Sequence, residues 1–336
     1  MALIQLQNNN SIIDRLSAID TKIAESLFDL RPDPDYFALL KKALSSKSAN
    51  ATITDEKSNM WGLLPGLCCQ AAGGQASWAD SLAASWILFY AAADLMDSIQ
   101  DQDEPADWWK KGGPEIALSA ATGLFFSAAS ILSTFDPCQE ISGLPLDFYK
   151  EFYRDFLQMS SGQYADLRSD QLSLDQYWEI TSKKSGSFFR LACRSGASLA
   201  TQDLVCRNHF ADFGHSLGIM IQVLDDLDDL NCLLSPERYR GYRSIFRSVP
   251  YIYAFQVLPD EEANLLQQMV LELHSNPQAG EDAFTLIEKS GATVYLLTQI
   301  ERHRSLAFEK IEKAVSNAEA REMLAQFVRP IGSLKK

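Results

Sequence analysis

Helical periodicity runs through almost the whole chain and constrains its fold more than any other feature. From Ile12 onward, apolar residues recur at spacings of three and four, as in Leu16, Ile19 and Ile23. This is the spacing of an amphipathic helix and not of an alternating strand. The same spacing predicts helices over residues 81–103, 116–132, 146–164, 175–200, 203–233, 261–273 and 292–314. Because no convincing alternation of Val, Ile and Thr accompanies it, the sequence predicts an all-α fold.

Short breaks separate the predicted helices. They fall at segments with Pro or Gly, namely residues 31–34, 73–74, 112–114, 136–137, 235–236 and 277–280. Such segments end helices without forming long linkers. We therefore expect residues 1–336 to form a single all-α domain, a large antiparallel helical bundle. Residues 45–58 are the best candidate for a mobile loop.

Charge and apolar content exclude several classes of protein. The chain has 44 acidic and 30 basic side chains, a formal net charge of -14, and no long Lys/Arg cluster, which argues against a nucleic-acid partner. The most apolar stretch, from Trp86 to Ala93, is much shorter than the roughly 20 residues of a bilayer-spanning helix, so we expect no membrane span. The N-terminus does not resemble a signal peptide, which predicts a cytoplasmic location.

The cysteines and histidines do not form a recognisable metal or disulfide pattern. The chain has six Cys and four His, and no Cys-x-x-Cys pair. Zinc and a disulfide framework are therefore not expected.

Acidic residues follow an apolar helical run at two places. Asp94, Asp97 and Asp101 come directly after the run that ends at Ala93 and fall within an arc of about 60° on a helix. One such cluster is usually a solvated helix face, so a second cluster of the same kind is needed to favour a function.

The second cluster lies about 120 residues later on another predicted helix. Gln222, Asp225, Asp226 and Asp229 fall within about 100° of arc, while Asp228 points away. Like charges one turn apart repel, so bound cations are the natural compensation. Carboxylates without His or Cys suit a hard ion, and we predict Mg²⁺ ions bound together with a substrate diphosphate.

In their order and spacing these motifs resemble those of the trans-prenyltransferases, or polyprenyl diphosphate synthases, and of the terpene cyclases with the same fold. The resemblance covers about residues 55–255. The segment from Asp97 to Asp101 (DSIQD) matches the family's Asp-Asp-x-x-Asp motif except at Ser98. The segment from Gln222 to Asp229 matches the second motif completely, and Lys184-Ser185 resembles the Lys-Thr pair that binds the allylic diphosphate. The resemblance implies an isoprenoid-synthase bundle around a central apolar cavity.

Two departures from the family bear on the reaction. Elongating members carry Gly-Lys-Arg to hold isopentenyl diphosphate, but the equivalent residues 57–60 (KSNM) lack the basic pair. The Arg-Arg-Gly-x-Pro segment behind the first motif is also missing, unless Lys110-Lys111 and Pro114 replace it. These losses favour an enzyme that ionises one allylic diphosphate, with cyclisation or quenching of the cation as the first expectation. Chain elongation, prenylation of a peptide or aromatic acceptor, and a non-catalytic regulatory subunit remain alternatives.

The resemblance also implies roles for individual residues. The catalytic metal ligands would be Asp97, Asp101, Asp225 and Asp229, with Asp94 and Asp226 as further candidates. Substrate would be bound by Lys184 and Gln222, with weaker candidates in Lys183, Arg243 and Arg247, and two more arginines, Arg238 and Arg240, follow the same motif. A homodimer is left open.

The substrate's chain length is predicted from the first acidic helix. A tail anchored at Asp97 would run along this helix toward its N-terminus and pass Ala93 and Ala92 before it meets Phe89 and Trp86. The two alanines leave room for about one more helical turn, which favours a C15 to C20 allylic diphosphate, with C20 preferred. Further aromatic candidates for the pocket are Phe188 and Tyr164.

Overall fold

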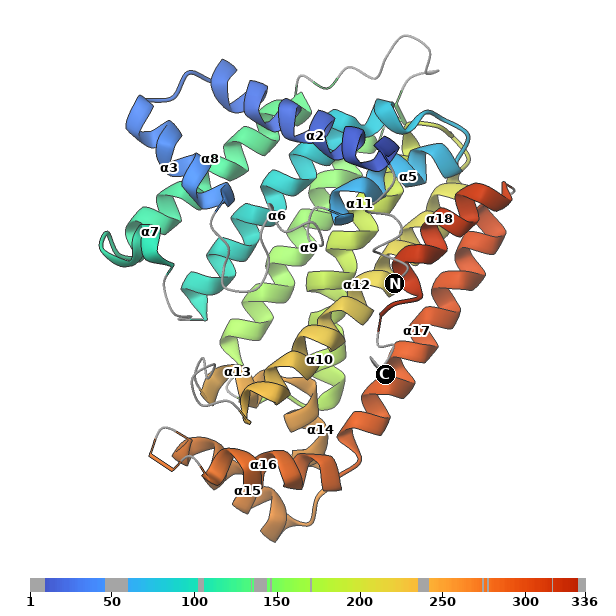
Figure 1. The fold of residues 1–336 in the computed structure, drawn as a ribbon. Helices are drawn as coiled ribbons and strands as arrows, with labels where there is room; N and C mark the ends of the chain where they lie inside the picture. Colours follow the sequence, from blue (N-terminus) through green and yellow to red (C-terminus); the bar gives the residue numbers. More distant parts are fainter. Residues whose placement is uncertain are drawn as a thin grey trace. The chain divides into compact units, whose positions relative to one another are not determined.

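The computed structural model describes most of the chain (Figure 1). The described residues are 10–45, 60–101, 106–133, 135, 144–145, 147–169, 171–234, 242–273, 275–276, 278–315 and 317–331, and among them the side chains of residues 10–12, 229 and 242–243 are not covered.

All regular elements within these ranges are helical and none is a β-strand, so the all-α prediction is confirmed. The N-terminal part contains α2 (Asn10–Asp29), α3 (Pro34–Ser45), η1 (Met60–Leu63), α5 (Leu64–Ala71), η2 (Ala76–Ala79), α6 (Asp80–Gln100), α7 (Asp107–Lys110), α8 (Pro114–Ser133) and α9 (Phe148–Arg168). The remainder contains α10 (Leu174–Thr181), η3 (Ser182–Gly186), α11 (Ser187–Ser198), α12 (Leu204–Cys232), α13 (Tyr242–Arg247), α14 (Val249–Val257), α15 (Asp260–Glu272), α16 (Gln278–Lys289), α17 (Ala292–Ala314) and α18 (Ala318–Val328).

Most predicted helices are present, with their ends shifted by a few residues. The range 292–314 coincides with α17, and 203–233 differs from α12 by one residue at each end. The first acidic helix, α6, ends at Gln100 and not at 103. The helix predicted over 175–200 is divided, because the π-helix η3 separates α10 from α11. A π-helix widens the helical turn locally and is common at functional sites.

Several elements were not predicted from the sequence, and one predicted break was wrong. The missed α-helices are α3, α5, α7, α13, α14, α16 and α18. Gly280 lies inside α16, where a Cβ atom would clash with the carbonyl oxygen of Leu233, so close packing and not a turn explains this glycine. Pro34 and Pro114 begin α3 and α8, the position at which proline suits a helix. The predicted breaks at 136–137, 235–236 and 277, and residues 46–58 of the predicted loop, lie outside the described residues.

The chain divides into two compact units built from separate segments. Unit 1 comprises residues 1–154, 190–214 and 308–330, and unit 2 comprises residues 155–189, 215–307 and 331–336. The prediction of a single domain stays a prediction.

Packing of α6 against α8 forms a large part of the core of unit 1. Small residues such as Ala84 and Ala121 are fully buried, which allows the two helices to approach closely. The buried Ser85 Oγ donates a 2.8 Å hydrogen bond to the Ala128 carbonyl oxygen, and the rings of Phe89 and Phe125 lie 5.7 Å apart. The apolar half of the first acidic helix is therefore held in the core.

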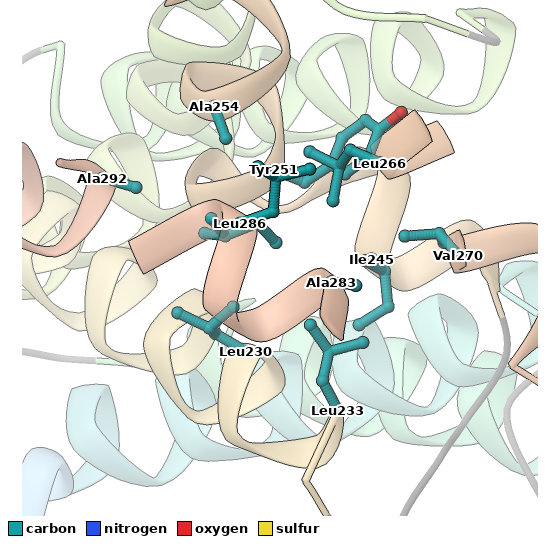
Figure 2. Close-up of a cluster of buried hydrophobic side chains, with 11 residues drawn as sticks. Leu230, Leu233, Ile245, Tyr251, Ala254, Leu266, Val270, Ala283, Leu286 and Ala292 are labelled. Carbon is teal, nitrogen blue, oxygen red and sulfur yellow. The ribbon is translucent and has the colours of Figure 1, made fainter. Parts of the chain in front are cut away.

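The C-terminal part of unit 2 has a core of its own, formed where α12 to α17 meet (Figure 2). Leu230 and Leu233 near the end of α12 pack in one cluster with Leu266 of α15 and Ile287 of α16. Tyr251 of α14 also belongs to this cluster. Burial of these side chains fixes the elements that follow the second acidic motif.

Two segments, Ala76–Gln100 and Pro114–Ser133, are long and apolar enough to cross a membrane, judged by length and composition alone. They contain α6 and α8, and 56% and 44% of their most apolar windows are buried inside the structure. Buried core helices share these properties, so the finding is weak evidence for a membrane protein. The absence of a membrane span and the cytoplasmic location stay predictions.

Candidate active site

The first acidic cluster lies where α6 leaves the core of unit 1. Residues 82–89 of the helix are buried, whereas Asp94 and Asp97 in its last turns are partly exposed. Asp101 is the C-cap residue, and its backbone N–H donates a 2.8 Å hydrogen bond to the Asp97 carbonyl oxygen. The helical geometry that brings Asp97 and Asp101 to one face therefore extends to the end of the motif.

The side chains predicted to line the substrate tail lie along the same helix. Trp86, Phe89 and Ala92 are buried, and Ala93 is partly exposed. The Phe89 ring lies 6.1 Å from the Phe152 ring in unit 1, and Trp86 stacks on Tyr90 at the same separation of ring centroids. These side chains pack in the core. Their role along a substrate channel stays a prediction. The central apolar cavity also stays a prediction.

The second acidic cluster lies on α12, within unit 2. Asp225 and Asp228 are exposed, whereas Asp226 is only 5% exposed. Gln222 Nε2 donates a 2.9 Å hydrogen bond to Asp226 Oδ1, and the backbone N–H of Val249 donates a 2.7 Å hydrogen bond to Asp226 Oδ2. Asp225 is therefore the more accessible of the two adjacent acids, while Asp226 connects α12 to α14. The side chain of Asp229 lies outside the described part.

The π-helix η3 places Lys184 and Ser185 beside α12. Ser185 Oγ donates a 2.7 Å hydrogen bond to Gln222 Oε1, which joins η3 to the second motif. The backbones approach closely, because a Cβ atom at Gly218 of α12 would clash with the Ser185 carbonyl oxygen. His215 of α12 and Ser182 of η3 form a further 2.9 Å hydrogen bond. Ser185, in the segment that resembles the family's Lys-Thr pair, thus belongs to one hydrogen-bonded group with Gln222 and Asp226.

Asp166 near the end of α9 is a site residue that the sequence analysis missed. It is buried, and its Oδ2 atom lies 3.2 Å from Lys184 Nζ. Its Oδ1 atom lies 3.8 Å from Arg247 Nη1, and Arg247 Nη2 donates hydrogen bonds to the carbonyl oxygens of Leu167 and Ser169 at 3.4 and 3.2 Å. Asp166 is one of several charged residues in the 21-residue helix α9. The spacing of residues along the sequence therefore could not distinguish it from the others.

The remaining candidates have different surroundings. Lys183 Nζ lies 2.5 Å from Glu179 Oε1 in a pair whose acid is largely exposed, the arrangement of a solvated helix face. Phe188 is buried. Tyr164 is 63% exposed, so its prediction as a pocket residue was wrong, because this part of α9 faces solvent. Residues 235–241, which contain Arg238 and Arg240, and the side chain of Arg243 lie outside the described part.

A buried phenol adjoins the second motif. Burial raises the pKa of Tyr177 in α10 well above its ordinary value, and the negative charge of Asp226 raises this pKa further. Tyr177 therefore stays neutral at physiological pH.

The donor atoms of both acidic helices fit a hard divalent cation. They are carboxylate and amide oxygens, the ligand types that Mg²⁺ prefers. Among the described residues, no three acidic, His or Cys side chains lie close enough together to hold a metal ion. The two motifs belong to different units and the side chain of Asp229 is not described, so the assignment of Asp97, Asp101, Asp225 and Asp229 as metal ligands stays a prediction.

Comparison with known proteins decides the family. The model of the polyprenyl synthetase family matches residues 59–287, more than half of the chain. The chain belongs to the polyprenyl synthetase family. This confirms the resemblance drawn from the two acidic motifs and from Lys184.

Relatives within this family differ in their reactions. Tryptophan prenyltransferase ComQ of Bacillus subtilis subsp. natto is 31% identical over 145 residues, which are 43% of each chain. Geranylgeranyl diphosphate synthase of Sulfolobus acidocaldarius is 24% identical over 277 residues, 76% of this chain and 81% of the synthase. The chain spans roughly half, or less, of the length of the first curated relatives it matches. The expectation of an enzyme acting on prenyl diphosphates agrees with these names.

A solved member of the polyprenyl synthetase family has the same fold. Polyprenyl synthase from Caulobacter crescentus, in complex with calcium and isoprenyl diphosphate, superposes with a TM-score of 0.77 at 18% identity, over 97% of this chain and 95% of that one. At this identity the likeness shows the fold alone. The predicted isoprenoid-synthase helical fold is therefore confirmed.

Proposed function

We propose that the chain is a prenyltransferase that releases diphosphate from one allylic isoprenoid diphosphate and transfers the prenyl group to an acceptor without a diphosphate. The observation that carries this proposal is the hydrogen-bonded group of unit 2. It joins the match to the diphosphate-binding Lys-Thr pair, Lys184 and Ser185, to Gln222 and Asp226 of the second acidic motif. Lys184 on η3 and the acidic residues of α12 are thereby held on adjoining helices.

Each group has a distinct role in this proposal. Asp97, Asp101, Asp225 and Asp229 would hold Mg²⁺ ions, with Asp94 and Asp226 as further candidates. When bound, these ions neutralise the charge that develops on the departing diphosphate. Lys184 donates a charge-assisted hydrogen bond to the same leaving group, and Asp166 orients its ammonium. Gln222 keeps Asp226 in place while Asp225 stays accessible.

Two features favour an acceptor without a diphosphate. Residues 57–60 lack the basic pair that elongating members use for isopentenyl diphosphate. The relative with 31% identity is named a tryptophan prenyltransferase. The comparisons do not support cyclisation specifically, and it stays a prediction. Chain elongation is the main competitor, because the Sulfolobus acidocaldarius relative is named a synthase.

Incubation of the full chain with Mg²⁺ and C10, C15 or C20 allylic diphosphates tests the proposal. We expect diphosphate release from the C15 and C20 substrates, and a prenylated product when a tryptophan-containing peptide is added. A product one C5 unit longer in the presence of isopentenyl diphosphate would establish elongation instead. No diphosphate release under any of these conditions would favour a non-catalytic regulatory subunit.

We also propose that the protein is a cytoplasmic homodimer that uses α9. Tyr149, Tyr153, Leu157 and Tyr164 are exposed and fall within about 80° of arc on this helix. A contiguous exposed apolar stripe commonly marks a protein interface. Sedimentation analysis should show a dimer for the parent and a monomer for Leu157→Glu, whereas a monomeric parent would contradict this assembly.

A further inference from the structure

Unit 2 contains a cavity that the proposed diphosphate chemistry does not use. It has a volume of about 670 Å³ and is lined by residues of the segment 171–176 and of α13, α14 and α15. Pockets that hold small ligands typically measure about 300–1,000 Å³. The cavity is therefore large enough for a ring system with its substituents.

Three aromatic side chains form one wall of this cavity. The Phe246 and Tyr251 rings are arranged edge to face with centroids 5.0 Å apart, and Tyr251 stacks on Phe255 at 5.8 Å. Leu172 and Ile252 complete the apolar lining. Offset and edge-to-face arrangements favour a further flat ring over an aliphatic chain.

Two neutral polar groups accompany this wall and are accessible to a ligand. Tyr251 is only 6% exposed, and within the described residues its hydroxyl makes no hydrogen bond. In Figure 2 the hydroxyl oxygen points away from Leu230 and Leu233. Gln267, also in the lining, has an amide without a partner in the described part of the chain. A ligand with a polar edge can form hydrogen bonds with both groups.

Charge narrows the ligand class further. Arg247 lies at the cavity, so a cationic ligand is disfavoured. The guanidinium is held by Asp166 and by two backbone carbonyl oxygens. The lining also offers the Tyr251 phenol and the Gln267 amide, which are neutral hydrogen-bonding groups. The lining therefore fits a neutral aromatic ring that carries an N–H or O–H group.

The cavity adjoins the diphosphate-binding group. Arg247 belongs to its lining and lies 3.8 Å from Asp166, which in turn lies 3.2 Å from Lys184 Nζ. We propose that this cavity binds an indole or phenol ring as the prenyl acceptor. The acceptor role rests on the transfer reaction proposed above, whereas binding of the ring does not.

The step balances with the two substrates alone. The allylic C–O bond breaks, and its electron pair leaves with the diphosphate. A π electron pair of the ring forms the new bond to the prenyl carbon, and the ring then loses one proton to solvent. The products are the prenylated ring, diphosphate and a proton.

Titration calorimetry of the full chain with N-acetyl-L-tryptophanamide, in the absence of diphosphates, tests the site. We expect saturable binding, weaker binding of N-acetyl-L-leucinamide, and an affinity about fivefold lower for Tyr251→Phe, because one hydrogen bond is lost. Gln267→Leu should lower the affinity similarly. Gln268→Leu, which alters the exposed neighbour on α15, is the matched control and should bind as the parent does.

The outcomes separate the two proposals. Equal affinities in all variants, or no saturable binding of N-acetyl-L-tryptophanamide, would overturn the site. Binding together with diphosphate release from a C15 substrate, but with an unmodified ring, would overturn the acceptor role. Binding without any diphosphate release would support the ring site and contradict the proposed transferase reaction.

Discussion

Asp226 Oδ2 accepts a hydrogen bond of 2.7 Å from the backbone N–H of Val249, the first residue of α14. The N-cap residue Ser248 supplies no side-chain hydrogen bond to this helix. An acid on α12 therefore caps a helix that begins 23 residues later. The carboxylate also lies at the positive end of the α14 dipole, which stabilises its charged form. Two adjacent acids of one motif, Asp225 and Asp226, consequently have different roles.

This division predicts different outcomes for two neighbouring substitutions. Asp226→Ala should lower the free energy of unfolding by about 1–3 kcal/mol, because it leaves the Val249 N–H and the Gln222 amide without their acceptor in a buried region. Asp225→Ala should leave stability unchanged or slightly raised, since it removes a repulsive charge. Chemical denaturation of both variants measures these changes.

The same pair tests the predicted metal ligands. Asp225→Ala, like Asp97→Ala, should abolish diphosphate release although the protein stays folded. Near-normal turnover by Asp225→Ala would remove this residue from the metal site. Equal stabilities of the two α12 variants would contradict the capping role of Asp226.

The two lysines of η3 should also differ in their effects. Lys184→Gln should lower kcat for diphosphate release by roughly 10- to 100-fold, because a charge-assisted contact to the leaving group is lost. Lys183→Gln removes only a partly exposed pair with Glu179, and such pairs contribute little. Steady-state kinetics at saturating Mg²⁺ compares the variants. A larger loss in Lys183→Gln than in Lys184→Gln would reverse the assignment.

The substrate channel that the sequence predicts along α6 can be tested through substrate length. Ala93→Phe should shift the preference from C20 toward C15 or C10 allylic diphosphates, because the ring would block the path from Asp97. Ala91→Phe is the matched control, since residue 91 lies about 160° from Phe89 around the helix and residue 93 about 40°. Competition between C10, C15 and C20 substrates gives the ratios of kcat/KM. Unchanged C20 turnover in Ala93→Phe would place the tail elsewhere.

His303 of α17 predicts a loss of stability in acid. Burial, together with the charge of Arg302, lowers its pKa from the ordinary 6.5 to about 4. The unfolded chain therefore binds the proton more readily, so this contribution to stability is present above pH 6.5 and is lost as the pH falls toward 4. After allowance for solvent screening at this partly exposed ring, we expect a loss of about 1 kcal/mol.

Denaturation of the parent and of His303→Gln at a series of pH values isolates this effect. The difference in unfolding free energy between the two proteins should change between pH 6.5 and 4 and be constant above pH 7. A difference that is independent of pH would contradict the lowered pKa of His303.

The spacing of apolar and acidic residues along the sequence predicted most of the long helices and the faces on which the acidic residues lie. Spacings of three and four identified most of the long helices, since this periodicity reflects which face of each helix is buried. The positions of Asp97, Asp101 and Asp225 on their helix faces also followed from about 100° of rotation per residue. Short helices such as α13 and α14 were missed, because a few residues show too little periodicity to be distinguished from a turn.

The sequence by itself determined the all-α class, the two acidic helices and the family, because each depends on residues close together in the chain. The tertiary structure alone decided that Asp226 is buried as a cap while Asp225 is exposed, and that Asp166 accompanies Lys184. These partners are separated by 23 residues in the pair of Asp226 with Val249 and by 18 in the pair of Asp166 with Lys184. Whether such groups meet depends on how helices pack, and packing is set by many side chains together and not by spacing along one helix.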